Sequence, residues 1–151
     1  MTTATGRVRA PELRGAGGWI NTDIALSLRD LRGRVVVLDF WTFCCINCLR
    51  VVEELRNLEQ RFGDRLVVIG VHSPKFPHEA DHAAVVRAVA RHRLDHPVLD
   101  DPDLETWQQY GVRAWPTLVV HRSGRVRGCD GVGRGQRAGA RWSDRAAPRR
   151  A

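Results

Sequence analysis

The stretch LDFWTFCCINCLR, residues 38 to 50, holds three of the chain's four cysteines within five positions. A short apolar, β-branched run, Gly33 to Phe40, leads into it and predicts a buried strand. After it, apolar residues recur at helical spacing until Gly63, which predicts a helix that ends there. The helix-spaced residues are Leu49, Val52, Leu55, Leu58 and Phe62. The cysteines therefore lie where a buried strand is followed by a helix.

This position distinguishes the three thiols. We expect Cys45 at the helix N-terminus, where free backbone N–H groups and the helix dipole favour an anion. Cys48 follows one turn later, so its thiol can donate a hydrogen bond to a Cys45 thiolate. In such a pair Cys45 attacks a disulfide, and Cys48 resolves the mixed disulfide by attacking Cys45. We expect Cys44 in the turn before the helix, pointing away from the pair.

A C-x-x-C pair can also be half of a zinc site. Structural zinc takes four ligands, and the sequence has no second pair, so we expect no metal. Two further features favour redox chemistry. Asp39 lies six residues before Cys45 in an apolar run, and a carboxylate there is costly unless it has a function or a partner. Pro116, in the stretch AWPT, directly precedes an expected strand, and we predict that the Trp115–Pro116 bond is cis.

The remaining elements predict an α/β domain. The order of strands and helices indicates parallel strands joined by helices and then an antiparallel hairpin. The expected segments are a strand over 65–73, a helix over 78–94, a strand over 96–101, a short helix after it, and hairpin strands over 117–121 and 125–128. We divide the chain into an N-terminal arm (1–30), this domain (31–128) and a basic tail (129–151).

Charge is concentrated at the C-terminal end. Residues 1–120 carry 15 basic and 15 acidic side chains, whereas residues 121–151 carry nine Arg against two Asp, which accounts for the net charge of +7. The tail has no periodic apolar pattern, so we expect it to be disordered and expect no nucleic-acid partner. The N-terminus has no apolar signal-peptide core, and no apolar run is long enough to cross a bilayer. We therefore expect a cytoplasmic protein without a membrane partner.

The motifs resemble a known family. DFWTFCCINC is similar to the active-site strand and loop of thioredoxins, and WPT resembles their cis-proline segment. The longer stretches LDFWTFCCINCLR, GVHSPKFPHEA and HPVLDDPDLETWQQYGVRAWPTLVV resemble the thioredoxin-like domain of NHL repeat-containing proteins, within the redoxin class. The resemblance covers about residues 10 to 125. It implies a thioredoxin-like α/β fold, with a central mixed sheet flanked by helices.

The resemblance also implies roles for individual residues. Cys45 matches the nucleophile, Cys48 the resolving thiol, and Asp39 the buried carboxylate that takes the Cys48 proton through water. Pro116 matches the cis-proline that faces the disulfide. Trp115 and Trp41 are then the expected substrate-binding residues. The implied function is thiol–disulfide oxidoreduction without a cofactor beyond the Cys45–Cys48 disulfide. The implied partners are protein or small-molecule disulfides and a reductant such as a thioredoxin reductase or the glutathione system.

The sequence departs from the thioredoxin pattern in three places. Ile46 and Asn47 replace Gly-Pro between the cysteines, and residues at these positions tune the reduction potential. The NHL repeats are absent. After Gly128 the chain lacks the apolar helix that closes a thioredoxin fold, and its tail resembles a GC-rich gene translated in a shifted frame. We therefore hypothesise that the C-terminus is truncated or frame-shifted.

Three alternative functions remain open. The first is a non-enzymatic thioredoxin-fold interaction module. The second is a copper site of Cys44, Cys48 and His121, because thiolates and imidazole suit copper. The third is peroxide reduction, for which Thr42 fits the peroxiredoxin pattern but Leu38 stands where a proline is expected. The other histidines share no metal-site spacing, and we expect them to be solvated or to cap helices. They are His72, His78, His82, His92 and His96.

Overall fold

The computed structural model describes residues 10–122 and 125–128. Within them a six-stranded sheet has the order β1-β4-β3-β2-β5-β6. The three central strands β2, β3 and β4 are parallel, and β1, β5 and β6 pair antiparallel. The strands are β1 (Gly18–Ile20), β2 (Val35–Trp41), β3 (Leu66–His72), β4 (Val98–Asp100), β5 (Thr117–Arg122) and β6 (Arg125–Gly128). The predicted mixed α/β sheet with a terminal hairpin is confirmed.

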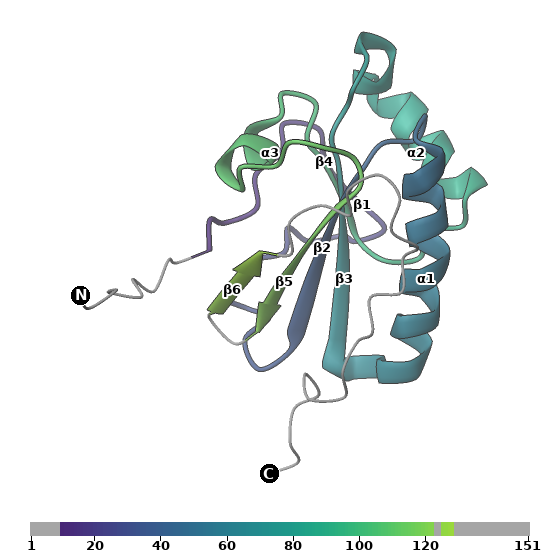
Figure 1. The fold of residues 1–151 in the computed structure, drawn as a ribbon. Helices are drawn as coiled ribbons and strands as arrows, with labels where there is room; N and C mark the ends of the chain where they lie inside the picture. The colour runs from purple at the N-terminus through teal and green to yellow at the C-terminus, as the bar shows by residue number, and fades with distance from the viewer. Residues whose placement is uncertain (1–9, 123–124, 129–151) are drawn as a thin grey trace.

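Helices cover both faces of the sheet. Figure 1 shows α1 (Ile46–Phe62) and α2 (His82–Arg91) on one side of it and the short α3 (Glu105–Gln109) on the other. All seven residues of β2 are buried as a result. Their side chains alternate between the two faces. Val35, Val37 and Trp41 pack on the α1 and α2 side, whereas Val36, Leu38 and Phe40 pack on the α3 side.

Local signals set the limits of α1. Cys45 is the N-cap residue, and its sulfur accepts a hydrogen bond from the Cys48 backbone N–H. At the other end Gly63 has a φ of 52° and donates its N–H to the Glu59 carbonyl. That φ lies in the left-handed region, where glycine is favoured. The predicted helix end at Gly63 is confirmed.

The segment after β3 is divided differently from the prediction. In place of one helix over 78–94, a 3₁₀ turn (Pro77–Ala80) precedes α2. Asp81 separates them because it caps α2, and its carboxylate accepts a hydrogen bond of 3.2 Å from the Ala84 N–H. A second 3₁₀ turn, Gly63–Arg65, joins α1 to β3.

Part of the predicted N-terminal arm belongs to the sheet. The arm packs along β4, where the Gly17 N–H donates to the Asp100 carbonyl at 3.1 Å, and Gly18–Ile20 then pair with β4 as β1. The predicted disordered tail and the absence of a closing helix concern residues that lie outside the described ones. None of the described helices is long and apolar enough to cross a membrane.

Candidate active site

The cysteines lie where β2 gives way to α1. Cys45 is half-buried, and its Sγ accepts a hydrogen bond of 3.2 Å from the Cys48 N–H. The turn is closed by the Cys45 N–H, which donates to the Thr42 carbonyl at 3.2 Å. The Cys45 sulfur thus receives a backbone donor at the helix N-terminus.

Cys48 is the buried member of the pair. Its side chain has no exposed surface and packs with Trp41 and Val52. Burial raises the pKa of the Cys48 thiol far above its usual value, and its hydrogen bond with the Cys45 side chain raises the pKa further. Cys48 therefore needs a nearby base before it can act as a nucleophile.

Asp39 supplies a carboxylate beside Cys48. It lies on the α1 side of β2, between Val37 and Trp41, and is fully buried. Burial raises the Asp39 pKa to about 7, an effect that a charge on His96 opposes. The Asp39 charge also raises the Cys48 pKa, so the two groups are electrostatic neighbours. A carboxyl group with a pKa near neutrality can accept and return a proton at physiological pH.

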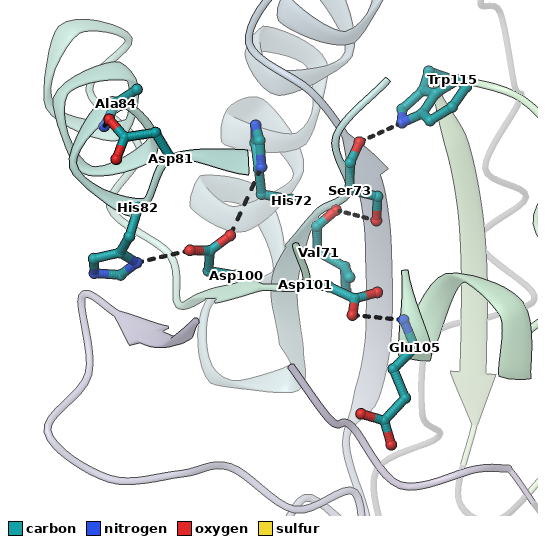
Figure 2. A network of polar contacts seen from close by, with 10 residues as sticks. All are labelled: Val71, His72, Ser73, Asp81, His82, Ala84, Asp100, Asp101, Glu105 and Trp115. Atoms are coloured by element: carbon teal, nitrogen blue, oxygen red, sulfur yellow. Dashed lines mark hydrogen bonds and ion pairs between the residues drawn. The ribbon is translucent and has the colours of Figure 1, made fainter. Parts of the chain in front are cut away.

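The proline segment lies beside β2. The Trp115–Pro116 peptide bond is cis, as predicted. Pro116 is buried, and the half-buried Trp115 packs against the same apolar cluster as Cys45. The Trp115 indole N–H donates to the Ser73 carbonyl at 2.7 Å, a contact drawn in Figure 2. This bond ties the proline segment to the end of β3.

Aromatic and imidazole rings support the loop before Cys45. Trp41 is fully buried, so in this structure it offers no surface to a substrate and belongs to the core beneath the loop. The His72 ring lies edge-on to Trp41 at 5.0 Å and stacks on Phe43 at 5.4 Å. Burial lowers the His72 pKa to about 4, so this ring is neutral at physiological pH. His72 acts as an aromatic support for the loop.

A carboxylate stands between two histidines at the ends of β3 and β4. Figure 2 shows Asp100 between His72 and His82. Its oxygens lie 2.7 Å from His82 Nδ1 and 4.0 Å from His72 Nδ1. Burial raises the Asp100 pKa, and the hydrogen bond from His82 opposes that effect. This network joins α2 to the sheet rather than to the cysteine pair.

Comparison with known proteins identifies the family. The Thioredoxin-like family model matches residues 33–126. The chain belongs to the thioredoxin-like family. Over 113 residues it is 48% identical to NHL repeat-containing protein 2 of Gallus gallus, covering 73% of this chain and 16% of that protein. It is 26% identical to the thiol–disulfide oxidoreductase YkuV of Bacillus subtilis over 94 residues, or 62% of each chain. The chain thus spans only part of these relatives.

A solved structure shows the same fold. The thioredoxin-like superfamily protein SPOA0173 superposes with a TM-score of 0.67 at 25% identity, covering 79% of this chain and 82% of that one. The predicted thioredoxin-like fold and the resemblance to NHL repeat-containing proteins are both confirmed.

In this thioredoxin-like chain the third cysteine has its own surroundings. Cys44 is exposed, and its Sγ lies 3.4 Å from His78 Nε2. Partial desolvation by neighbouring atoms and the Glu79 charge raise the Cys44 pKa. Among the described residues, Cys44, His78 and Glu79 form the one group whose ligand atoms all lie within 4.8 Å of one another. Sulfur, imidazole and carboxylate donors of this kind suit zinc, although Cys44 and His78 are both exposed.

The copper site proposed from Cys44, Cys48 and His121 does not form in the structure. His121 pairs with Val36 and lies edge-on to Tyr110, on the α3 side of the sheet. Cys48 packs on the α1 side. The sheet therefore separates the imidazole from the thiol.

The expectation that His72 and His96 are solvated or cap helices is wrong. His72 has no exposed surface, and His96 is 6% exposed. His96 precedes Pro97 just before a buried strand, and this position was the sequence signal that could have predicted its burial. Its proximity to Asp39, which is 57 positions away, could not be deduced from spacing.

Proposed function

We propose that this chain catalyses thiol–disulfide exchange, with Cys45 as the nucleophile and Cys48 as the resolving thiol. One observation carries the proposal: a half-exposed sulfur at a helix N-terminus bonded to the backbone of a fully buried cysteine one turn away. The exposed member can meet a substrate, and the buried member can meet only Cys45.

The exchange proceeds in two steps. The Cys45 thiolate attacks one sulfur of a substrate disulfide, the substrate S–S bond breaks, and one substrate thiolate leaves. The Cys48 sulfur then attacks Cys45 Sγ, which forms the Cys45–Cys48 disulfide and releases the second substrate thiolate. Asp39 takes the Cys48 proton in this second step. The reaction consumes no cofactor, because a reductant restores the two thiols.

Substrate recognition is proposed at the proline segment. Pro116 directly precedes β5. An extended substrate that lies along this segment would contact the backbone of Trp115, beside Cys45. We propose protein or small-molecule disulfides as substrates and a thioredoxin reductase or the glutathione system as the reductant. We also place the reaction in the cytoplasm, where such reductants keep thiols reduced.

Insulin reduction driven by dithiothreitol tests the function. Cys45→Ser should abolish the activity, whereas Cys44→Ser, which removes the neighbouring thiol, should keep most of it. Wild-type protein that folds but does not reduce insulin or a small aromatic disulfide would leave the interaction module as the better description. Glutathione titration of the Cys45–Cys48 couple gives the direction, since a potential near about −270 mV favours reduction and one near about −120 mV favours oxidation.

A further inference from the structure

Four buried polar atoms of the structure need a common explanation. Both carboxylate oxygens of Asp39, the Trp41 Nε1 and the His96 Nε2 are buried without a hydrogen-bond partner among the described residues. Buried polar groups are otherwise almost always paired, because an unpaired one costs about 1–3 kcal/mol. These atoms therefore point to a function.

Two of these atoms, Trp41 Nε1 and His96 Nε2, lie close to Gly70 on β3. A side chain at Gly70 would place its Cβ 3.1 Å from Trp41 Nε1 and 3.4 Å from His96 Nε2. Gly70 is the parallel partner of Asp39, so a side chain there would project from the same face as the carboxylate. A side chain at Gly70 would also lie 3.3 Å from Val98 Cγ2, so Gly70 leaves His96 Nε2 close to the face from which Asp39 projects.

His96 is held in place from two directions. Its backbone carbonyl accepts a hydrogen bond of 3.1 Å from the Asn21 amide, which also binds the Leu94 carbonyl at 2.6 Å. Its other ring nitrogen, Nδ1, lies 3.5 Å from Glu59 Oε2 on α1. The ring is thus placed with Nδ1 toward the Glu59 carboxylate and Nε2 toward Gly70, the strand partner of Asp39.

Exposure increases along this series of groups. Cys48 and Asp39 have no exposed surface, the His96 side chain is 4% exposed, and the Glu59 side chain is 30% exposed. Among the described residues, the other titratable groups that interact with Asp39 or His96 are Cys48 and Glu59, both on α1. The series leads from the resolving thiol to solvent.

We propose that His96, oriented by Glu59, is the positioning residue through which Asp39 exchanges the Cys48 proton with solvent. The inference rests on the proposed function. When Cys48 attacks Cys45 of a mixed disulfide, its proton passes to Asp39 and the substrate thiolate leaves with the electron pair of the broken S–S bond. The proton then moves from Asp39 to His96 Nε2, and His96 releases its Nδ1 proton toward Glu59. The next turnover begins with an ionised Asp39.

The charge on His96 also sets the pH at which Asp39 can act. A protonated His96 lowers the Asp39 pKa and so opposes the effect of burial. Without the imidazole, Asp39 should keep its proton to higher pH and be a poorer acceptor at neutrality.

Single-turnover release of thionitrobenzoate tests the relay. The test uses protein that carries Cys44→Ser and Cys129→Ser, so that only Cys45 and Cys48 keep their thiols. The symmetrical aromatic disulfide of thionitrobenzoate reacts with Cys45 and releases one coloured thionitrobenzoate in the first phase. Cys48 then attacks Cys45 and expels the second thionitrobenzoate in the second phase. Thionitrobenzoate leaves as a thiolate and needs no proton. The pH profile of the second phase therefore reports how Cys48 loses its thiol proton. The wild-type rate should rise with a midpoint near the Asp39 pKa of about 7.

Three variants should move that midpoint to higher pH. His96→Gln should slow the second phase on the order of tenfold at pH 6.5 and leave the rate at high pH almost unchanged. Gly70→Ala should act in the same direction, because its Cβ would crowd the His96 ring without removing a charge. Glu59→Gln, at a partly exposed position, should have a smaller effect. His92→Gln, a histidine on the same loop without a contact to Asp39, is the matched control and should leave the profile unchanged.

A second measurement does not depend on activity. Carbon-13 NMR of the Asp39 carboxyl carbon in the reduced protein should show a midpoint that moves upward in His96→Gln and not in His92→Gln. An unchanged midpoint in folded His96→Gln and Glu59→Gln, by both methods, would overturn the relay. If the wild type releases no second thiolate while the NMR midpoint still moves, the proposed function fails and the coupling of His96 to Asp39 stands.

Discussion

The space between β2 and α1 has two halves of opposite character. The aliphatic half holds Val35, Val37, Val51, Leu55, Leu66 and Val68. The redox half holds Cys48, Asp39, Trp41 and His96, with four buried polar atoms that lack partners among the described residues. One strand and one helix border both halves. The comparison indicates that the aliphatic half stabilises the fold, whereas the unpaired buried polar atoms of the redox half lower its stability.

Cys48→Ser, in the redox half, should have the largest effect on catalytic turnover. The variant keeps the nucleophile at Cys45, but nothing resolves the mixed disulfide. Covalent substrate adducts should therefore accumulate on Cys45 and turnover should stop. Mass spectrometry of the protein after exposure to insulin without reductant detects them. Adducts found on Cys44 instead would show that the nucleophile has been misassigned.

Asp39→Asn should raise the free energy of unfolding above neutral pH. The folded protein holds the Asp39 proton up to a pH of about 7, whereas an unfolded Asp loses it near pH 4. Wild-type stability should therefore fall as the pH rises from about 4 to about 7. At pH 8 the variant should be more stable by about 4 kcal/mol, and the gain should vanish below about pH 4.

Urea unfolding across this pH range measures the difference. The same variant should resolve mixed disulfides more slowly, because the base has been removed. A variant less stable than the wild type at pH 8 would contradict the view that the redox half lowers stability.

Leu55→Ala tests the aliphatic half. Leu55 is 2% exposed and packs against β2 and β3, so removing its methyl groups should lower the free energy of unfolding by about 3 kcal/mol. Urea unfolding measures that loss. The rate of disulfide exchange in the folded fraction should stay within about twofold of the wild type, since Leu55 lies outside the redox half. A tenfold slower exchange would show that the two halves are coupled.

Ile46→Ser should have the smallest effect on stability. Ile46 is 66% exposed beside Cys45, so the free energy of unfolding should change by less than about 0.5 kcal/mol. An unfolded protein substrate can cover this side chain, so the KM for such a substrate should rise a few-fold in the variant. The KM for a small aromatic disulfide should stay unchanged. Equal effects on both substrates would place Ile46 in the chemistry rather than in substrate contact.

Much of the fold could be predicted because its signals are local. The apolar run of β2, the helical spacing after Cys48 and Gly63 at the helix end each depend on neighbouring residues. The short β1 escaped prediction because three residues in a glycine-rich arm carry no periodic pattern, and pairing with β4 alone defines them. The prediction of one continuous helix over 78–94 was wrong at Asp81. The Asp81 side chain caps α2, and this hydrogen bond makes a new helix begin there.

The sequence by itself determined where the C-x-x-C cysteines and the acidic residue of the buried strand lie. Cys45, Cys48 and Asp39 lie within ten positions, so their relation follows from one strand, one turn and one helix. Only the tertiary structure decided what surrounds them. It brought His96, which lies before β4, close to Asp39 on β2. It also buried Trp41 beneath the loop and placed His121 on the face of the sheet opposite Cys48. Contacts between distant segments depend on how the strands align and which faces they bury, and local spacing does not encode either.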